Sequence, residues 1–392
     1  MKKFPITYFL KIYYDFEDYY VDFTMSQKPS IIICGNYGIQ NIGDEAILQG
    51  ILLIVRGAFP QARITVLSSK PTQTSHEYQV KSLPYWPAGF RSFFTFRWWR
   101  NLKSYYKADA ILLGGGGLFA DEKPQAPFIW TMQVFAAFLL RKPVFCFAQS
   151  VGPLQTSSGR KLAKFVFQKA KFVTVRDDES KKLLGELGVG NVHVLADPAF
   201  ALSYTHPTFE KRGEYIVLTL RPWMKGDQAA IDQELALFIR WVYTKFGFKT
   251  LFVPFQKLQE NDEARYEALR KIIPEDFFEL YEGEHSVQGI LKVTAGSQAV
   301  VGMRLHSVIF SSITQTPFLA LSYSEKVRNF VKSLDCEQFL EYENLDFDTL
   351  KKNFVCLMQQ PREAIVKLEK AKMQKTYLAF DHEKLLRKLI ED

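Results

Sequence analysis

Short apolar runs that alternate with helix-length amphipathic segments constrain the fold of this chain more than any other feature. The runs short enough to be buried strands lie at residues 30–34, 63–67, 110–113, 144–148, 172–175 and 192–195. The segments between them with apolar side chains at helical spacing lie at residues 44–56, 128–140, 160–168 and 179–187. This alternation is typical of a parallel sheet covered by helices on both faces. We therefore predict an α/β fold of the doubly wound, Rossmann-like kind.

The alternation is interrupted by a polar stretch at residues 203–213. After it, strands are predicted at residues 215–220, 250–253, 299–301 and 318–321, and helices at 228–246, 264–273 and 305–313. A chain of 392 residues is too long for one core, since single domains usually hold about 100–200 residues. We predict an N-terminal extension (1–27), two Rossmann-like domains (28–205 and 206–345) and a C-terminal helical tail (346–392). Such domains bind ligands beyond the carboxyl ends of their strands, so the site is expected in a cleft between them.

Composition excludes several classes of protein. Apolar residues make up 47% of the chain and charged residues 23%, which rules out a disordered, collagenous or coiled-coil chain. The four cysteines lie far apart, which favours a cytosolic protein over a disulfide framework, and no metal-ligand spacing is present, so we predict no metal site. No run of about 18 apolar residues is available to span a bilayer. The formal net charge of +8 suggests an anionic partner.

The predicted extension has two interpretations. Residues 1–24 either lie upstream of a functional start at Met25, or form an anchor built from their many tyrosines and phenylalanines.

Two glycine-rich stretches follow predicted strands, and both are expected to line the cleft. The first opens the helix at residues 44–56 and contributes Gly35, Asn36, Gly38, Asn41 and Gly43. The second is the run at residues 114–117, predicted to be a loop in which Gly115, Gly116 and Gly117 approach a ligand. Glycines permit close backbone approach, and a helix N-terminus favours an anion. Asp44 at this N-terminus is a candidate catalytic carboxylate, with a plain helix cap as the alternative.

Cationic side chains stand at the ends of four predicted strands. They are Arg176, Arg221, Arg304 with its neighbour His306, and Lys326. A guanidinium matches the geometry of a carboxylate or phosphate, and an ammonium adds a point charge. Converging from two domains, these residues predict a substrate with several negative charges.

Each of these residues also has a structural interpretation. Arg176 has Asp177 and Asp178 beside it as ion-pair partners. Lys326 is explained equally well as a solvated surface lysine, and His306 as a structural histidine. We favour a catalytic histidine because arginine precedes it at a strand-to-helix junction.

The motifs together resemble a known family. In order they are Gly-Asn-Tyr-Gly and Asn-Ile-Gly-Asp-Glu within residues 35–45, the glycine run, Gln-Ser-Val-Gly-Pro at 149–153, Val-Arg-Asp at 175–177, Asp-Pro-Ala at 197–199, Leu-Arg-Pro-Trp at 220–223 and Met-Arg-Leu-His at 303–306. From about residue 30 to 326 the set resembles the polysaccharide pyruvyl transferase family. The Leu-Arg-Pro-Trp stretch is most similar to its bacterial cell-surface-anchoring (CsaB-like) branch. Ser150 departs from the pattern, since the family has glycine there.

The resemblance implies a fold similar to the two-domain GT-B glycosyltransferases. It implies transfer of the pyruvyl unit of phosphoenolpyruvate to a sugar, forming a 4,6-ketal and releasing phosphate, with no cofactor besides this donor. The implied acceptor is N-acetylmannosamine in an undecaprenyl-diphosphate-linked cell-wall precursor at the cytoplasmic face of the membrane. The pyruvylated polymer then anchors surface-layer-homology-domain proteins.

The predicted cations suit this donor, because phosphoenolpyruvate carries both a carboxylate and a phosphate. Our hypothesis is that His306 is the general acid/base, since histidine moves protons near neutral pH. Arg176, Arg304 and Lys326, with Arg221, would bind the donor and stabilise the leaving charge. Asp44 would orient or deprotonate an acceptor hydroxyl.

An aromatic and basic stretch at residues 90–106 stands apart from these motifs. Its densest part is Arg97, Trp98, Trp99 and Arg100. We predict contact with anionic lipid, which would place the protein peripherally at the inner face of the membrane. A helix packed on the core and a stacking site for single-stranded nucleic acid are the alternatives, and we expect no nucleic-acid partner.

Two other functions compete with pyruvyl transfer. One is a GT-B-type glycosyltransferase that uses a nucleotide sugar, and the other is a non-catalytic protein that binds a glycan precursor. No oligomeric state follows from the sequence.

Overall fold

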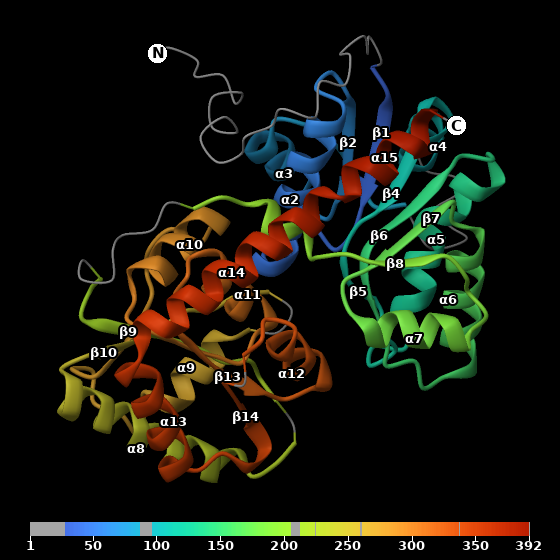
Figure 1. Ribbon diagram of the computed structural model, residues 1–392. Coiled ribbons are helices and arrows are strands. Elements are labelled where there is room, and N and C mark those ends of the chain that lie inside the picture. The colour runs from blue at the N-terminus through green and yellow to red at the C-terminus, as the bar shows by residue number, and fades with distance from the viewer. Residues whose placement is uncertain are drawn as a thin grey trace, which may run out of the picture.

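The computed structural model describes residues 28–86, 96–204, 212–223, 225–258, 261–336 and 338–391. The predicted extension at residues 1–27 lies outside these residues, as do residues 90–95 of the aromatic and basic stretch and the predicted domain boundary at 205–206. The chain forms two parallel sheets flanked by helices (Figure 1). The predicted α/β class with two doubly wound sheets is therefore confirmed.

The first sheet has eight strands, in the order β3-β2-β1-β4-β6-β7-β8, with β5 paired to β6. The strands are β1 (Ser30–Cys34), β2 (Arg63–Ser68), β3 (Lys81–Pro84), β4 (Ala110–Leu113), β5 (Gly116–Phe119), β6 (Val144–Val151), β7 (Phe172–Val175) and β8 (Val192–Val194). The helices of this half are α2 (Ile42–Ala58), α3 (Pro71–Tyr78), α4 (Phe96–Lys107), α5 (Ala126–Leu139), α6 (Ser157–Lys169) and α7 (Asp178–Glu186).

Alternation along β1 shows how this sheet is covered. Ile32 and Cys34 belong to a core shared with Tyr105 of α4, Trp130 of α5 and Val166 of α6. Ile31 and Ile33 point to the opposite face, where α2 packs. Because side chains alternate across a strand, α4, α5 and α6 lie on one face of the sheet and α2 on the other.

The second sheet has six strands, in the order β11-β10-β9-β12-β13-β14. The strands are β9 (Tyr215–Thr219), β10 (Lys249–Phe252), β11 (Phe278–Leu280), β12 (Val300–Gly302), β13 (Phe318–Ser322) and β14 (Phe339–Glu341). Its helices are α8 (Gln228–Phe246), α9 (Glu263–Leu269), α10 (Val287–Gly296), α11 (Leu305–Ile313), α12 (Glu325–Lys332) and α13 (Phe347–Gln359).

The predicted strands are all present, with ends that differ by a few residues at most. The prediction of a loop over the glycine run was wrong, because Gly116 and Gly117 begin β5 and pair with β6. Four glycines hide the strand from any test of apolar alternation. The edge strands β3, β11 and β14 were also missed, since their sequences KSLP, FEL and FLE contain no continuous apolar run of three residues.

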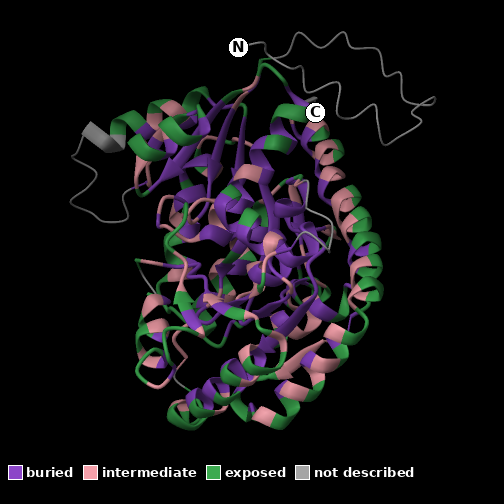
Figure 2. Cartoon of the chain, turned by 90° about the vertical axis from the view of Figure 1, so that its left-hand side faces the viewer, coloured by how far each residue is buried: buried purple, intermediate pink, exposed green. Residues whose placement is uncertain are grey.

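The last two helices join the halves. Helix α14 (Pro361–Phe380) packs on α11 and on the short helix η2 (Pro198–Ala201), and α15 (His382–Glu391) crosses back onto α2. The two helices form the long red rod of Figure 1. Figure 2 shows their outer side exposed and the sheets buried. The predicted helical tail thus belongs partly to the first core, where Leu386 and Leu389 are buried.

The two halves also touch at the carboxyl ends of their strands. Asn41, just before α2, forms an isolated antiparallel bridge with Gln256 beyond β10. The Ile42 amide donates to the Phe255 carbonyl at 3.0 Å. Across the described ranges, no helix has both the length and the hydrophobicity required to cross a bilayer.

His382 fastens α15 to the first sheet. Its ring is fully buried and stacks on Phe147 with 4.1 Å between centroids. Nδ1 lies 2.9 Å from the Ala379 carbonyl oxygen, which only accepts, so Nδ1 carries the proton and Nε2 accepts from the Thr174 hydroxyl at 3.0 Å. Burial lowers the pKa of His382 from 6.5 to about 4, so the folded protein holds this ring neutral.

This histidine predicts a loss of stability in acid. Between its folded and unfolded pKa values the unfolded chain binds the extra proton, so stability falls as pH drops through this window. From about pH 7.5 to about pH 5.5 the His382 contribution is a loss of about 1 kcal/mol. His382→Phe keeps the stacked ring and should remove this part of the pH dependence in urea unfolding. His76→Asn, at an exposed position on α3, is the control; equal pH slopes for His382→Phe and the parent would contradict the assignment.

Candidate functional site

The carboxyl ends of both sheets point toward the contact between the halves, and most of the predicted residues meet there. The first half supplies the N-terminus of α2, the start of β5, the end of β7 and η2. The second half supplies the junction of β12 with α11 and the first turn of α12.

Asp44 lies in the first turn of α2 without capping it. The cap is Asn41, whose Oδ1 accepts from the amides of Gly43 at 3.0 Å and Asp44 at 3.4 Å. The Asp44 carboxylate instead accepts a 2.9 Å hydrogen bond from the side chain of Asn36. The alternative interpretation of Asp44 as a plain cap is therefore wrong.

The surroundings of Asp44 favour a carboxyl that exchanges protons near neutral pH. Burial raises its pKa from 3.8 to about 6, although His306, the Asn36 amide and Arg176 oppose this rise. A carboxyl tuned this way suits general acid–base chemistry.

His306, in the first turn of α11, reaches across to the other half. A Cβ atom added to Gly43 would lie 2.3 Å from Nδ1 of His306, so the ring can sit here only because residue 43 is glycine. Nε2 lies 3.7 Å from Oδ2 of Asp197, too far for a hydrogen bond. This buried nitrogen has no hydrogen-bond partner among the described residues. It is thus placed to exchange a proton with a bound ligand.

Asp197 is the residue that the sequence analysis missed as a functional group. Its Oδ1 accepts from the Ala199 amide at 2.9 Å, and its Oδ2 lies 2.5 Å from Nη1 of Arg176. Burial alone would raise its pKa, but His306, Arg176 and the Ala199 amide outweigh burial and hold the pKa well below its usual range. Asp197 is therefore an ionised carboxylate facing a cation from its own half and an imidazole from the other. The sequence did contain a signal, because Asp197 lies just beyond the predicted strand at residues 192–195 and opens the Asp-Pro-Ala motif at 197–199.

Arg176 is held by groups other than its sequence neighbours. Besides Asp197, its Nε donates to the Ser150 hydroxyl at 3.1 Å. Ser150 in turn donates to Asp177 at 2.6 Å, and Asp177 caps α7. The alternative in which Arg176 pairs with Asp177 or Asp178 is wrong. The serine that departs from the family pattern supplies an extra contact to this arginine.

Lys326, in the first turn of α12, faces the glycine run. Its Nζ lies 3.8 Å from the position that a Cβ on Gly117 would occupy. Burial, together with the charge of Arg176, lowers the pKa of this ammonium. Within the described ranges it forms no hydrogen bond or ion pair. The solvated-surface interpretation is wrong, because this lysine is a half-buried cation beside a second cation.

Glycines from both glycine-rich stretches support this arrangement. Gly116 has a φ of 102°, and a Cβ there would lie 3.5 Å from Asp44 Oδ1. Gly38 donates its amide to Glu45 at 2.8 Å, which ties the loop to α2.

Arg304 lies near Asp44 but is engaged elsewhere. Its Nε and Nη2 both donate to Asp262, a fully buried carboxylate. Asp262 also accepts from the amides of Phe255 and Gln256, each at 3.0 Å. Arg304 therefore fixes the segment that bridges to Asn41, a positioning role that the sequence did not reveal.

Arg221 is surrounded by aromatic rings at the ends of β9 and β13. Its guanidinium carbon lies 4.9 Å from the centroid of Tyr323 and 5.5 Å from that of Trp223, and Nη1 donates to the Tyr323 hydroxyl at 3.1 Å. Residues 97–100 lie on α4, outside the cleft, and the side chains of Arg97 and Trp98 are outside the described residues. In the described part of the chain, no three His, Cys, Asp or Glu side chains group as metal ligands.

Comparison with known proteins identifies the family. Residues 41–325 match the family described as polysaccharide pyruvyl transferase. The chain belongs to this family. The matched range contains Asp44, Arg176, Asp197 and His306, and it ends one residue before Lys326. The enzyme is accordingly a transferase of the pyruvyl-transferring kind.

Similar proteins agree with the family and the fold. The amylovoran biosynthesis protein AmsJ of Erwinia amylovora is 23% identical, with 78% of this chain and 86% of AmsJ covered. Anabaena HepE, solved with UDP-glucose, aligns with a TM-score of 0.63 at 10% identity over 92% of this chain and 98% of HepE. The UDP-GlcNAc 2-epimerase of Methanocaldococcus jannaschii gives 0.63 at 12% identity over 93% and 100%. At such identities these structures show the GT-B-like fold alone.

The contact between Gly43 and His306 gives a sharp test of this polysaccharide pyruvyl transferase. Gly43→Ala should push the imidazole from its place, and displacements of about 1 Å cost about 100-fold in rate. Gly185→Ala is the matched control, since a Cβ at this helical glycine meets nothing within 4 Å. Steady-state pyruvyl-transfer rates and thermal unfolding should be measured on both. Full activity of a folded Gly43→Ala variant would contradict the proposed position of His306.

Proposed function

We propose that the enzyme transfers the pyruvyl unit of phosphoenolpyruvate to two hydroxyls of one sugar, forming a cyclic ketal and releasing phosphate. The observation that carries this proposal is the half-buried Lys326 ammonium, which stands over Gly117 and forms no ion pair with the described residues. Burial disfavours the charged ammonium, and a bound anion would offset this cost. A small anionic donor fits such a position.

The donor would span the contact between the halves. Arg176 offers a guanidinium already oriented by Asp197 and Ser150, and Lys326 adds a point charge from the other half. Together they offer contacts to a phosphate and to a carboxylate. The same cations stabilise the charge that develops on the departing phosphate.

The bonds and protons balance with the side chains present. The methylene carbon of the donor takes a proton from His306, and the first sugar hydroxyl attacks C2. The C2–O bond to phosphate then breaks, and the second hydroxyl closes the ring. Of the two hydroxyl protons, one restores His306 and the other leaves with phosphate. Asp44, with a pKa of about 6, accepts a hydroxyl proton on this route.

The acceptor that we propose is N-acetylmannosamine in an undecaprenyl-diphosphate-linked wall precursor, modified as a 4,6-ketal. The Leu-Arg-Pro-Trp stretch at residues 220–223, with its likeness to the CsaB-like branch, supports this choice. Such an acceptor places the enzyme in the cytoplasm, at the inner face of the membrane. The product would then serve to anchor surface-layer proteins.

A nucleotide-sugar glycosyltransferase is the competing enzyme, because the similar structures include proteins solved with UDP or UDP-glucose. Thermal-shift measurements separate the two functions. Phosphoenolpyruvate should stabilise the protein and UDP-sugars should not. The decisive assay incubates the enzyme with phosphoenolpyruvate and a lipid-linked N-acetylmannosamine analogue. Phosphate release with the mass gain of a pyruvate ketal is expected; neither of these, with stabilisation by a UDP-sugar, would overturn the proposal.

Single substitutions should separate binding from chemistry. His306→Ala should lower kcat by at least about 100-fold, since general acid–base groups contribute about 100- to 10,000-fold. Lys326→Ala and Arg176→Ala should mainly raise the KM for phosphoenolpyruvate. Lys332→Ala, at an exposed position on the same helix as Lys326, is the control and should match the parent. An unchanged KM in both cation variants would rule out their role in donor binding.

Asn36 provides a test of Asp44 through pH. If Asp44 must be ionised to accept a proton, kcat falls as the pH drops through about 6. The hydrogen bond from Asn36 favours the ionised carboxylate, so Asn36→Ala should raise this pKa and move the acidic limb to higher pH. The alkaline limb should stay in place. A profile with the same acidic limb in both proteins would remove Asp44 from the proton transfers.

A further inference from the structure

Helix α5 exposes an apolar stripe where a surface helix normally carries polar residues. Phe128, Phe135 and Leu139 are 51%, 38% and 69% exposed, and Met132 lies between them on the same side. Their spacing of four, three and four residues places them along one face of the helix. The opposite face is buried in the core through Trp130 and Val134. Both sides of α5 are therefore apolar, and the described residues cover only one of them.

Neighbouring helices extend this stripe into a wider surface. On α4, Trp99 is 61% and Tyr106 is 69% exposed, while Tyr105 is buried and donates to the Gln133 carbonyl of α5 at 2.7 Å. On α6, Phe165 packs beside Phe135, with 6.5 Å between ring centroids. We call the outward side of α4, α5 and α6 the α5 face.

The charges on the α5 face have a single sign. Helices α4, α5 and α6 contain no aspartate or glutamate. The cations with described side chains on α4 and α6 are Arg100, Lys103, Lys107, Arg160, Lys161, Lys164 and Lys169.

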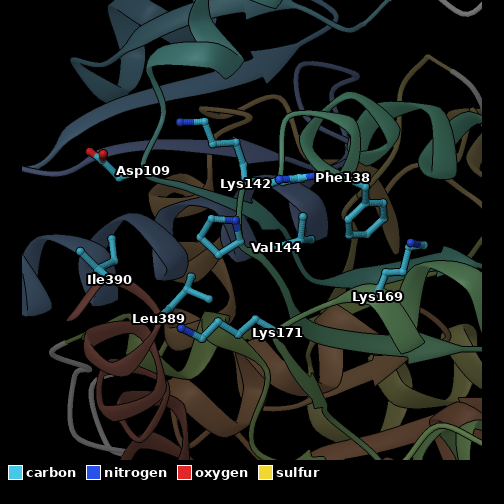
Figure 3. A pocket seen from close by; sticks show the side chains of 10 residues that line it. Asp109, Phe138, Lys142, Val144, Lys169, Lys171, Leu389 and Ile390 are labelled. Carbon is cyan, nitrogen blue, oxygen red and sulfur yellow. The ribbon is translucent and has the colours of Figure 1, made fainter. Parts of the chain in front are cut away.

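A hollow of about 630 Å³ lies just past the end of α5, and further basic residues line it. Figure 3 shows Lys142, Lys169 and Lys171 around it, with the apolar side chains of Leu389 and Ile390. Lys142 also lies over the ring of Tyr106, with Nζ 5.8 Å from its centroid. The acidic residue in the lining, Asp109, accepts a hydrogen bond from the Ser30 amide.

We propose that the α5 face binds the surface of a bilayer that contains anionic lipid. Aromatic and aliphatic side chains would enter the boundary between headgroups and acyl chains, and the surrounding cations would meet the lipid charge. A second copy of the chain fits poorly, because a two-fold interface would bring two sets of cations together. The occupant must be apolar and anionic together, which describes a lipid surface.

Our proposal differs in location from the membrane contact predicted from the sequence. The sequence placed it at residues 97–100, whereas Trp99 and Arg100 are at the border of a surface centred on α5. Helix α5 begins shortly after β5, whose Gly116 and Gly117 belong to the cleft, and it is about 20 Å long. A bilayer on this face would therefore lie alongside the cleft, where a lipid-linked acceptor is needed. In this respect the inference deepens the proposed function. The observations that support it are the exposed apolar and basic side chains of the α5 face, and they do not depend on the reaction.

The test is vesicle flotation of the full-length protein. Vesicles of phosphatidylcholine with about 30% phosphatidylglycerol are compared with pure phosphatidylcholine, in low and high salt. The parent should float with the anionic vesicles at low salt, and high salt should weaken this binding. Phe135→Ser combined with Leu139→Ser should reduce the bound fraction about tenfold. Leu237→Ser with Val366→Ser is the matched control, since these exposed residues lie on α8 and α14 and should leave binding unchanged.

Two further measurements keep the outcomes distinct. The Phe135/Leu139 variant should retain its circular dichroism spectrum and its activity on a lipid-free acceptor, so a loss of flotation reports on the surface. If the parent does not float, or floats as well after the double substitution, the proposal is overturned. It is overturned equally if light scattering shows a dimer that the double substitution dissociates. A parent that floats but transfers no pyruvate would contradict the proposed function and leave this inference standing.

Discussion

A buried carboxylate shared between the two halves of the molecule holds the site together. Asp197 is almost inaccessible to solvent, yet it remains ionised because Arg176 lies on one side and His306 on the other. Removing one partner of a buried charge typically costs about 3–5 kcal/mol, since the remaining charge is left uncompensated. The position of Arg176, the approach of α11 to α2 and the requirement for glycine at position 43 all depend on this arrangement.

The same arrangement separates two carboxyl groups by their surroundings. Asp197 has a pKa well below the usual range, whereas burial raises that of Asp44 to about 6. One acid is thereby a fixed negative charge and the other a group that can exchange a proton. When the surroundings move the pKa values of two carboxyl groups apart, one site can give these chemically similar side chains separate roles. Lys326 and Arg176 complete the site with positive charge for the donor.

Most of the fold could be predicted from sequence, because buried parallel strands and amphipathic helices leave periodic patterns. The short edge strands β3, β11 and β14 leave no such pattern. Arg176, His306 and Lys326 were found because each follows closely after a strand, and Asp44 because it opens the helix after the first glycine-rich stretch. Asp197 was missed as a functional group because its meaning depends on His306, which is distant in sequence, and the Arg304–Asp262 pair is equally non-local. The α5 face was missed because a helix that is apolar on all sides does not show which side is covered.

The most direct test is a crystal structure of the protein with phosphoenolpyruvate bound. The account predicts the donor between Arg176 and Lys326, against Gly117, with its methylene carbon facing Nε2 of His306. The phosphate and carboxylate should contact those two cations. Donor bound instead beside Arg221 and Trp223, or Lys326 paired with a protein carboxylate while the donor lies elsewhere, would contradict the central claim that this contact between the halves is the donor site.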